Sequence, residues 1–443
     1  MKVTSHVDPA HALAEYRRRM YSPLCGIVTS VGYSLRAKGS PNVFVAGGDL
    51  CGVHTLLGQQ APKAGSYHIG GSGLLPFEPE IRVYAEAAER YSSSVALLHS
   101  DLPVRWTSYR RLSDDGEPTV DRRHLSIAGP PLYDVFDVDA PLTWVKVPSL
   151  WSPHAAWVPA QFFFVGYQPR RHDGEPWLQA AVTTGTAVHT TYPKALAAAA
   201  YEIIQVDATM GHWYGDAEMF RIVPDDRTRR IDALLSSANR RSAYDLSFYH
   251  LPSADLPDFS VACLLSHRGG EAPVVSIGLG ADARLERAMY KAFLEGTGVR
   301  TLAEWGLISS RVNGVDAVSP DAMFDLDSNV SHYAAAPQGQ AVLDRFRSAS
   351  TSYASDLPED LPPGLAMDDD ALARHLLSAF RTTGKDVFYR DITPVDVASV
   401  GLKAVRLWCP QTLSLCLPSA PPAAHPRFAD YGGFTHVAPH PYP

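Results

Sequence analysis

The sequence predicts an α+β protein in which mixed sheets pack against helices, and two patterns support this class. Apolar residues recur at helical spacing in residues 79–91, and start or end signals mark two further helices at residues 194–207 and 282–295. Short strand-like runs lie between these helices, and the clearest occupy residues 142–147 and 161–165. With 443 residues, the chain has room for one large domain or for two to three smaller ones.

Composition excludes several classes of protein. Hydrophobic residues make up 46% of the chain and charged residues 19%, as in an ordinary soluble globular protein. The net charge of −8 argues against a general surface for nucleic acid or anionic membrane. No apolar run reaches membrane-spanning length, and the first residues lack the apolar segment of a secretion signal. The 5 cysteines are scattered without a C-x-x-C pair, so we expect free thiols and a cytoplasmic protein.

The stretch at residues 79–91 is predicted to be a helix with two different faces. It opens on a proline, where a missing N–H costs nothing. Its apolar stripe consists of Ile81, Tyr84, Ala85 and Ala88. The opposite face carries four charged side chains, Arg82, Glu86, Glu89 and Arg90. Two carboxylates and two guanidiniums on one face could hold metal ions and phosphates, whereas a solvated, salt-bridged face is the alternative.

The second helix repeats this arrangement. It follows Gly185 and places Glu202 and Gln205 on one face, so that oxygen ligands again share a side. The first helix likewise follows a glycine-rich stretch at residues 65–73, which we interpret as a loop whose backbone N–H groups can approach an anion. This stretch is not a Walker P-loop, since no Gly-Lys-Ser/Thr follows it, and a plain loop is the alternative.

The third helix, residues 282–295, carries Glu295, and we expect it to close at Gly296 and Gly298. It follows Gly-x-Gly-x-x-Ala at residues 278–283, which resembles a dinucleotide-binding turn after a strand-like run. This motif lies deep in the chain rather than in a first βαβ unit, so a nicotinamide oxidoreductase is a poor match. The shared pattern of the three helices instead indicates one device used three times.

The last part of the chain combines a compact strand–helix–strand unit with a proline-rich end. Residues 386–408 are expected to form this unit, with a capping box and a first-turn proline at residues 393–396. Alternating prolines near the end of residues 431–443 exclude helix and sheet there and impose an extended polyproline arm. In this arm we expect His436 and His440 to be exposed to solvent.

Five groups of residues occur in a fixed order along the chain. They are Gly71-x-Gly73 with Glu86-x-x-Glu89-Arg90, Gly185-x-Ala187 with Glu202-x-x-Gln205, Gly278-x-Gly280 with Glu295 and Arg300, Asp391-x-Thr393 with Arg406, and Pro439-x-Pro441-x-Pro443. Together they resemble the motifs of the YcaO family, and specifically of its azoline-forming cyclodehydratase branch. The resemblance covers residues 22–443, and the terminal Pro-x-Pro-x-Pro is its most specific part.

The resemblance implies a YcaO fold, in which mixed sheets and packed helices enclose an ATP site unrelated to a P-loop. It divides the chain into an N-terminal segment of the same domain (1–62), a catalytic domain (63–430) and an extended tail that reaches the active site (431–443). The implied cofactors are ATP and Mg²⁺, an ion that prefers hard oxygen ligands such as carboxylates.

The resemblance also assigns roles to individual residues. The metal would be held by Glu86, Glu89, Glu202, Gln205 and Glu295. The nucleotide would further contact Gly71, Ser72, Gly73, Arg82, Arg90, Thr184 and Arg300. Catalysis would involve Glu202, Gln205 and the terminal carboxylate of Pro443, which serves either as the general base or as an element that orders the pocket.

The implied reaction joins a Cys, Ser or Thr side chain of a ribosomally made precursor peptide to the preceding amide carbonyl, and ATP phosphorylates the resulting oxyanion. The product is a thiazoline or oxazoline, as in peptide natural-product and antibiotic biosynthesis. The expected partners are the precursor peptide, an E1-like or ThiF-like protein that binds its leader, and a second copy in a homodimer.

Two alternatives to this reaction stay open. One is a stand-alone, bottromycin-like enzyme that forms a macrolactamidine or a thioamide with the same ATP chemistry. The other is a catalytically inactive scaffold that binds a peptide, which departures from the family motifs at Arg82, Thr184 and Gly298 support. Val206 also stands where the family usually has arginine, so we expect a divergent member.

Overall fold

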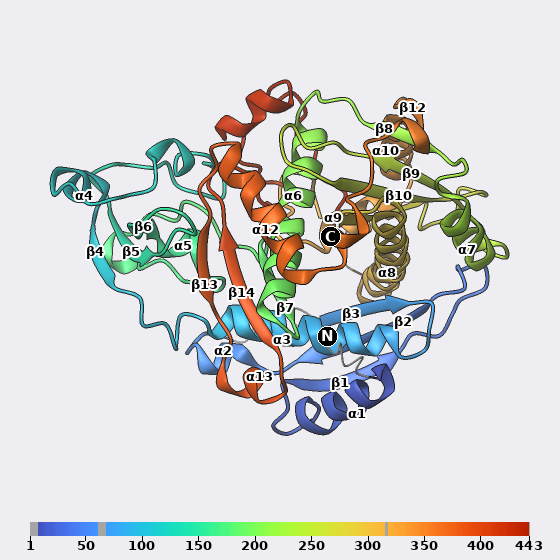
Figure 1. The fold of residues 1–443 in the computed structure, drawn as a ribbon, viewed down its shortest axis with the longest axis horizontal. Coiled ribbons are helices and arrows are strands. Elements are labelled where there is room, and N and C mark those ends of the chain that lie inside the picture. Colours follow the sequence, from blue (N-terminus) through green and yellow to red (C-terminus); the bar gives the residue numbers. More distant parts are fainter. Residues whose placement is uncertain (1–7, 61–67, 315–317, 443) are drawn as a thin grey trace.

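The structure, a computed structural model, describes residues 8–60, 68–314 and 318–442. Within these ranges the strands form three three-stranded sheets and one five-stranded sheet, and helices pack against them (Figure 1). The α+β class expected from the sequence is confirmed by this arrangement.

Strands and helices are numbered in chain order. The strands are β1 (Val28–Tyr33), β2 (Phe44–Leu50), β3 (His68–Gly73), β4 (Val104–Ser108), β5 (Pro141–Val147), β6 (Ala156–Pro159), β7 (Thr186–His189), β8 (Phe220–Val223), β9 (Tyr244–His250), β10 (Phe259–His267), β11 (Val275–Asp282), β12 (Ser350–Tyr353), β13 (Phe388–Asp391) and β14 (Lys403–Trp408). The α-helices are α1 (Pro9–Met20), α2 (Val53–Leu56), α3 (Glu78–Val95), α4 (Tyr109–Asp114), α5 (Ala160–Phe163), α6 (Tyr192–Tyr214), α7 (Arg229–Asn239), α8 (Leu285–Asn313), α9 (Ser328–Ala334), α10 (Gln338–Arg347), α11 (Pro363–Ala366), α12 (Asp369–Thr382) and α13 (Val395–Ser399). A 3₁₀ helix, η4 (Pro426–Tyr431), begins the last segment of the chain.

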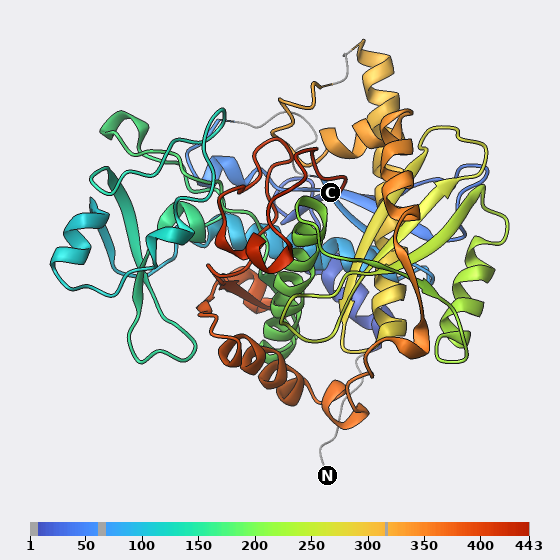
Figure 2. The same ribbon diagram turned by 90° about the horizontal axis from the view of Figure 1, so that it is seen from above.

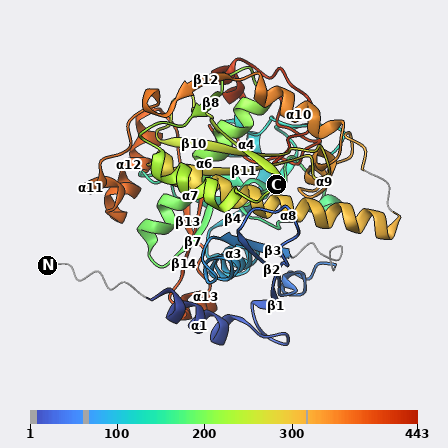
Figure 3. The same cartoon turned by 90° about the vertical axis from the view of Figure 1, so that its right-hand side faces the viewer.

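Three of the sheets end in a strand that leads directly into a long helix. The edge strand β3 of the sheet β1-β2-β3 precedes α3, the edge strand β7 of β13-β14-β7 precedes α6, and the edge strand β11 of β11-β10-β9-β8-β12 precedes α8. Each helix packs on its own strand and also contacts the edge strand of another unit: α3 contacts β7, α6 contacts β11, and α8 contacts β3. The three units thereby close into a ring in the middle of the molecule (Figures 1 and 3).

Glycines in these units permit close packing between strand and helix. A Cβ on Gly71 of β3 would lie 2.2 Å from the carbonyl oxygen of Pro79 in α3, so no other residue fits there without a shift. The interpretation of the first glycine-rich stretch as a loop is wrong for residues 68–73, which form strand β3. Residues 65–67 of that stretch lie outside the described residues.

The third glycine motif is also part of a strand. Residues 275–282 form β11, so the dinucleotide-binding turn is absent from this described part of the chain. A Cβ on Gly278 would lie 1.9 Å from the backbone nitrogen of Gly296 in α8. Contrary to the expectation from the sequence, the helix does not end at Gly296 and Gly298. Both lie inside α8, which continues to Asn313. The glycines bring strand and helix together and do not end the helix.

Two further local predictions are wrong. Residues 160–163 form helix α5 rather than a strand, because a short apolar run does not distinguish a buried strand from a buried helix. The capping box before α13 does not form, since the N-cap is Pro394 and no side chain caps the helix. Asp396 instead accepts a hydrogen bond from the N–H of Val397 at 2.9 Å. The strands expected on either side of this helix are present as β13 and β14, which pair antiparallel.

The remaining features of the fold concern the outlying sheet, the N-terminal strands and the character of the helices. The sheet of β4, β5 and β6 lies at one end of the molecule, away from the ring of strand–helix units (Figures 1 and 2). β1 pairs with β2, and β2 pairs with β3, so residues on both sides of the expected boundary at residue 62 share a sheet. The boundary itself stays a prediction. Among the described residues, no helix has the length and apolar character needed to cross a membrane.

Candidate functional site

Four glutamates of the three central helices form one electrostatically coupled group. Glu86 and Glu89 come from α3, Glu202 from α6 and Glu295 from α8. Burial raises the pKa of Glu89 to about 8 and that of Glu295 to about 7, and the negative charge of Glu86 adds to both shifts. Burial also raises the pKa of Glu202, and the charges of Glu89 and Glu295 contribute to this shift. We call these four residues the acidic cluster.

Backbone N–H groups of the edge strands hold the acidic cluster. Glu86 Oε2 accepts a hydrogen bond from the N–H of Gly70 in β3 at 2.7 Å. Glu295 Oε1 accepts one from the N–H of Leu279 in β11 at 3.1 Å. Backbone hydrogen bonds also reach the other two glutamates, Glu89 from Val188 in β7 and Glu202 from Gly185, which immediately precedes β7. The outer N–H groups of an edge strand have no partner within their own sheet, so the carboxylates occupy them.

Arg406 of β14 is the buried cation beside the acidic cluster. Its exposed fraction is 4%, and burial lowers its pKa to about 10 while the charges of Glu202 and Glu89 oppose that shift. Its guanidinium donates to the carbonyl oxygen of Thr184 at 2.7 Å and to that of Phe163 at 3.2 Å. The sequence marked Arg406 as part of a motif without giving it a role. Its position follows from the pairing of β14 with β7, a long-range register that no local pattern reveals.

Further cations lie along α3 and α8. Arg90 Nη2 lies 2.7 Å from Glu86 Oε1, and Arg90 Nη1 donates to the carbonyl oxygen of His68 at 3.0 Å. Arg82 is exposed, and its charge opposes the rise in the pKa of Glu295. The sequence did not assign Lys291 of α8 to the site. Burial lowers the pKa of Lys291, and the positive charge of Arg82 lowers it further. Arg90 and Arg82 are thus the cations of these helices that act on the acidic cluster, whereas Lys291 forms an ion pair with Asp282 at 2.8 Å.

The other residues expected at the nucleotide have partners within the protein. Ser72 is buried in β3 and faces α8, where a Cβ on Gly298 would lie 2.9 Å from Ser72 Oγ. Gly73 of β3 lies against the start of α3. Thr184 is buried, and its hydroxyl accepts a hydrogen bond from the N–H of Leu415 at 3.2 Å. Whether these groups touch ATP stays a prediction.

Arg300 and Gln205 differ in their surroundings. Arg300 is buried one turn beyond Glu295, forms an ion pair with Glu304 and lies over the ring of Tyr244 at 5.7 Å. These contacts direct it toward β9, and whether Arg300 reaches ATP stays a prediction. Gln205 is half-buried on α6, one turn after Glu202.

The proline-rich tail is buried for most of its end. Pro443, with the terminal carboxylate, lies outside the described residues. His440 has an exposed fraction of 0%, so its expected solvent exposure is wrong, and burial lowers its pKa to about 4. Its Nε2 lies 2.8 Å from the carbonyl oxygen of Cys416, and Tyr442 is equally enclosed. His436 is half-buried.

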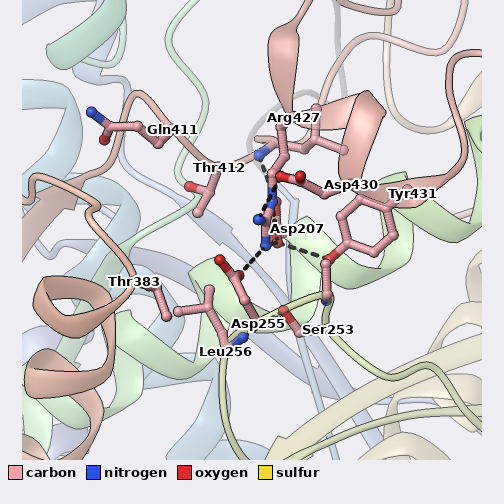
Figure 4. A network of polar contacts seen from close by, with 12 residues as sticks. Asp207, Ser253, Asp255, Leu256, Thr383, Gln411, Thr412, Arg427, Asp430 and Tyr431 are labelled. Atoms are coloured by element: carbon pink, nitrogen blue, oxygen red, sulfur yellow. Dashed lines mark hydrogen bonds and ion pairs between the residues drawn. The ribbon is translucent and has the colours of Figure 1, made fainter.

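A buried ionic network fixes the root of this tail to α6 (Figure 4). Arg427 Nη2 donates to Asp207 Oδ2 and to Asp255 Oδ1, both at 2.7 Å. Arg427 Nη1 donates to Asp430 Oδ2 at 3.0 Å, and the hydroxyl of Tyr431 donates to Asp207 Oδ2 at 2.8 Å. The side chains of Asp207 and Arg427 are 0% and 3% exposed. The network therefore ties η4 to the helix that carries Glu202.

The arrangement of carboxylates suits a metal ion whose remaining ligands are water and phosphate oxygens. In the part of the chain that the structure describes, no three Asp, Glu, His or Cys side chains surround one ion-sized position. Mg²⁺ takes one or two carboxylates and completes its shell with water and phosphate oxygens. The acidic cluster offers carboxylates from three helices, and these are the oxygen ligands that such an ion needs.

A family model described as YcaO cyclodehydratase, ATP- and Mg²⁺-binding, matches residues 70–413. This match covers more than half of the chain, and the chain belongs to the YcaO family. The family and the cofactors ATP and Mg²⁺ expected from the sequence are thereby confirmed. None of the curated proteins matches the chain in sequence.

Solved structures share the fold. A heterocyclase in complex with substrate and cofactor has a TM-score of 0.68 at 18% identity, covering 92% of this chain and 53% of its own. YcaO from Methanopyrus kandleri, bound with AMPPCP and Mg²⁺, has a TM-score of 0.59 at 16% identity and 92% coverage of both chains. The E. coli microcin synthetase McbBCD complex has a TM-score of 0.57 at 12% identity, covering 86% of this chain and 88% of its own. The chain thus spans about half the length of the heterocyclase, and identities this low show likeness of fold alone.

Proposed function

We propose that this chain is an ATP-dependent cyclodehydratase of peptide natural-product biosynthesis. Its substrate would be a ribosomally made precursor peptide, in which Cys, Ser or Thr residues become thiazolines or oxazolines. The observation that carries the proposal is the acidic cluster, in which carboxylates of three helices meet inside a fold of the YcaO family. An E1-like or ThiF-like protein would bind the leader of the precursor, and the chain would act as a homodimer.

The acidic cluster fits Mg²⁺ and a triphosphate on physical grounds. Burial, and then the like charge of a neighbouring glutamate, raises the pKa values of Glu89 and Glu202, and a divalent cation would offset this repulsion. We assign the metal to Glu86, Glu89, Glu202, Glu295 and the amide oxygen of Gln205. When bound, ATP would supply the phosphoryl group that makes the amide oxygen of the substrate a good leaving group.

Cations and backbone groups around the cluster would orient the phosphates. Arg82 is exposed at the site and free to turn toward a phosphate, and Arg90 already bridges Glu86 and the backbone of β3. Guanidinium groups bind phosphate through paired N–H donors, which suits this role. We extend the assignment to the main chain of residues 71–73, to Thr184 and to Arg300.

Ring closure also needs proton transfer. A base has to take the proton of the attacking thiol or hydroxyl and the proton of the amide nitrogen. We assign this role to the terminal carboxylate of Pro443, while Glu202 and Gln205 would hold the reacting amide. Burial of Tyr442 supports the assignment, because the described residue next to Pro443 lies inside the protein.

An inactive peptide-binding scaffold is the second candidate, and one observation favours it. The hydroxyl of Thr184 accepts from Leu415, and its carbonyl accepts from Arg406, so this motif position is engaged in internal contacts. A scaffold would bind a peptide without peptide-stimulated hydrolysis of ATP.

The test combines the chain, Mg-ATP, a candidate precursor peptide and a leader-binding partner, and follows peptide mass together with phosphate. Loss of one water for each phosphate released supports cyclodehydration. Exchange of oxygen for sulfur identifies thioamide formation, and loss of water with a ring between the peptide's amine and its backbone identifies a macrolactamidine. Unchanged peptide without phosphate release identifies the scaffold. The variant Glu202→Gln should be inactive, and Glu218→Gln, which changes an exposed glutamate beyond the end of α6, should match the wild type.

A further inference from the structure

Two aromatic side chains bind carbonyl groups near the end of the chain. The indole Nε1 of Trp213, in the last turn of α6, donates to the carbonyl oxygen of Ala438 at 2.9 Å. The hydroxyl of Tyr333, on α9, donates to the carbonyl oxygen of Pro439 at 2.6 Å. Proline has no N–H, so a chain that alternates prolines offers carbonyl oxygens as its main backbone contacts.

Asn329 of α9 binds the carbonyl groups of two further tail residues. Its Nδ2 donates to the carbonyl oxygens of His440 and Tyr442 at 2.7 and 2.6 Å. The residue is 0% exposed, and its Oδ1 is buried without a hydrogen-bond partner in the described part of the chain. The orientation of the amide is clear, because carbonyl oxygens accept and only the NH₂ side can serve both of them. Asn329 is therefore held here for its two donors.

Ring contacts fix the side chains of the same segment. The rings of His440 and Tyr442 stack with an interplanar angle of 17°, and Tyr442 meets Trp213 edge to face with centroids 6.0 Å apart. Trp213 is itself covered by the guanidinium of Arg345 at 4.4 Å. Backbone and side chains of residues 438–442 are thus held at once by Trp213, Asn329 and Tyr333, which we call the carbonyl clamp.

The carbonyl clamp is connected to the strand–helix units that carry the acidic cluster. Val330 of α9 packs with Val299 of α8, one turn past Glu295. At the start of α9, the carboxylate of Asp327 lies 3.7 Å from Nε2 of His68 in β3, the strand whose backbone holds a glutamate of α3. The helix that supplies two of the three donors therefore touches two of the three units.

We propose that Asn329 and Tyr333 are positioning residues, which hold residues 439–442 in the one conformation that the catalytic step requires. This inference rests on the proposed function. Neither side chain would touch the nucleotide or the peptide, and the effect of each would pass through the tail. Loss of a donor would therefore change the catalytic step and leave ATP binding unaffected.

The first test is kinetic and uses the full chain with its precursor peptide. Tyr333→Phe removes one donor, and Asn329→Leu, at a similar volume, removes the amide that donates to the carbonyl oxygens of His440 and Tyr442. The matched control is Tyr33→Phe, since the hydroxyl of Tyr33 also donates to a proline carbonyl, that of Pro76, at 2.6 Å but away from the tail. We expect each clamp variant to lower kcat by about tenfold with an unchanged KM for ATP, and the control to stay within about twofold.

Deletion of residues 439–443 completes the test. In the shortened chain, Tyr333→Phe should cause no further loss of kcat, because the group on which it acts is gone. Equal losses in the full and shortened chains would overturn the proposal, since they would show that Tyr333 acts independently of the tail.

A second measurement tests the clamp even if the proposed function fails. Amide hydrogen exchange of a C-terminal peptide that contains His440 and Tyr442 should accelerate about tenfold in both clamp variants and stay unchanged in Tyr33→Phe. Unchanged exchange in the clamp variants would overturn the proposal. A wild type with slow exchange and no peptide turnover would instead place the failure in the proposed function alone.

Discussion

Burial raises the pKa of Glu202 on α6, and the negative charge of Glu89 on α3 adds to the rise, so the two carboxylates interact although they are distant in sequence. Arg406 of β14 lies beside both, and its charge opposes the rise. The helices meet at this point because α3 packs on its own strand β3 and also contacts β7, the strand before α6. A pair of acids is therefore built from two strand–helix units.

Glu202→Gln should separate stability from activity. The substitution removes a buried carboxyl group whose ionisation is unfavourable in the folded protein, so the metal-free variant should gain about 1 kcal/mol in free energy of unfolding near pH 8. Peptide-dependent release of phosphate should fall by about 100-fold or more, because a metal ligand is lost. Thermal unfolding in the presence of a chelator and a phosphate assay measure the two effects. A variant that is both less stable and fully active would contradict the account.

The stability of the metal-free protein should decrease from about pH 5 to about pH 8. The pKa values of Glu89 and Glu295 are raised to about 8 and about 7, well above those of the unfolded chain. In this range the folded protein keeps protons that the unfolded chain has released, so a rise in pH favours unfolding. The stabilising contribution is complete at low pH and is lost as pH passes through the folded pKa values.

Denaturant unfolding at several pH values measures this slope, and excess Mg-ATP should flatten it by neutralising the cluster. Glu89→Gln should reduce the slope in the absence of metal. The contribution of Glu89 to the free energy of unfolding is the difference between the wild type and Glu89→Gln. If this contribution increased between pH 5 and pH 8, it would contradict the raised pKa.

Arg427→Met should destabilise the protein by about 3–5 kcal/mol, because it leaves the fully buried carboxylate of Asp207 without its cation. The double variant Asp207→Asn with Arg427→Met should be less damaged than the single one. Arg110→Met is the surface control, since Arg110 and Asp139 are both more than half exposed, and it should cost less than about 1 kcal/mol. Chemical denaturation gives all three values, and a single variant no worse than the control would argue against a structural role for the network.

Gly278→Ala should destabilise the protein by about 1–3 kcal/mol or more, since a methyl group at this point would meet the backbone of α8 at Gly296. Gly32→Ala in β1 is the control, because a Cβ there has no neighbour within 4 Å. It should be neutral or slightly stabilising. Similar unfolding midpoints for the two variants would show that β11 and α8 do not pack as closely as described.

The helices of the site could be predicted because local periodicity encodes them. The apolar stripe with Tyr84 and Ala88 is buried in α3 as expected, and the charged face that carries Glu89 turns toward the ring of units. The resemblance to a family added the order of the motifs, which no periodicity contains. The recurrence of glycine before each helix indicated one device used three times, but the structure has a strand, not only a loop, ahead of each helix.

The rest depended on contacts between distant parts of the chain. Gly296 was expected to end a helix, yet it lies inside α8, where it allows β11 to pack closely against the helix. Only the short distance between Gly278 and Gly296 reveals this role. His440 was expected in solvent, yet Asn329 and Trp213 enclose the segment around it. Arg406 reaches the acidic cluster through the register of β14 with β7, which sequence patterns do not specify.

The central claim is that carboxylates from three separate helices hold Mg²⁺ together with ATP. Calorimetric titration of a non-hydrolysable ATP analogue into Glu86→Gln, Glu202→Gln and Glu295→Gln, with and without Mg²⁺, tests it most directly. We expect Mg²⁺-dependent binding to weaken by about tenfold or more in each variant and to stay at the wild-type level in Glu218→Gln. Equal affinities in all four variants, or binding that does not depend on Mg²⁺, would contradict the claim.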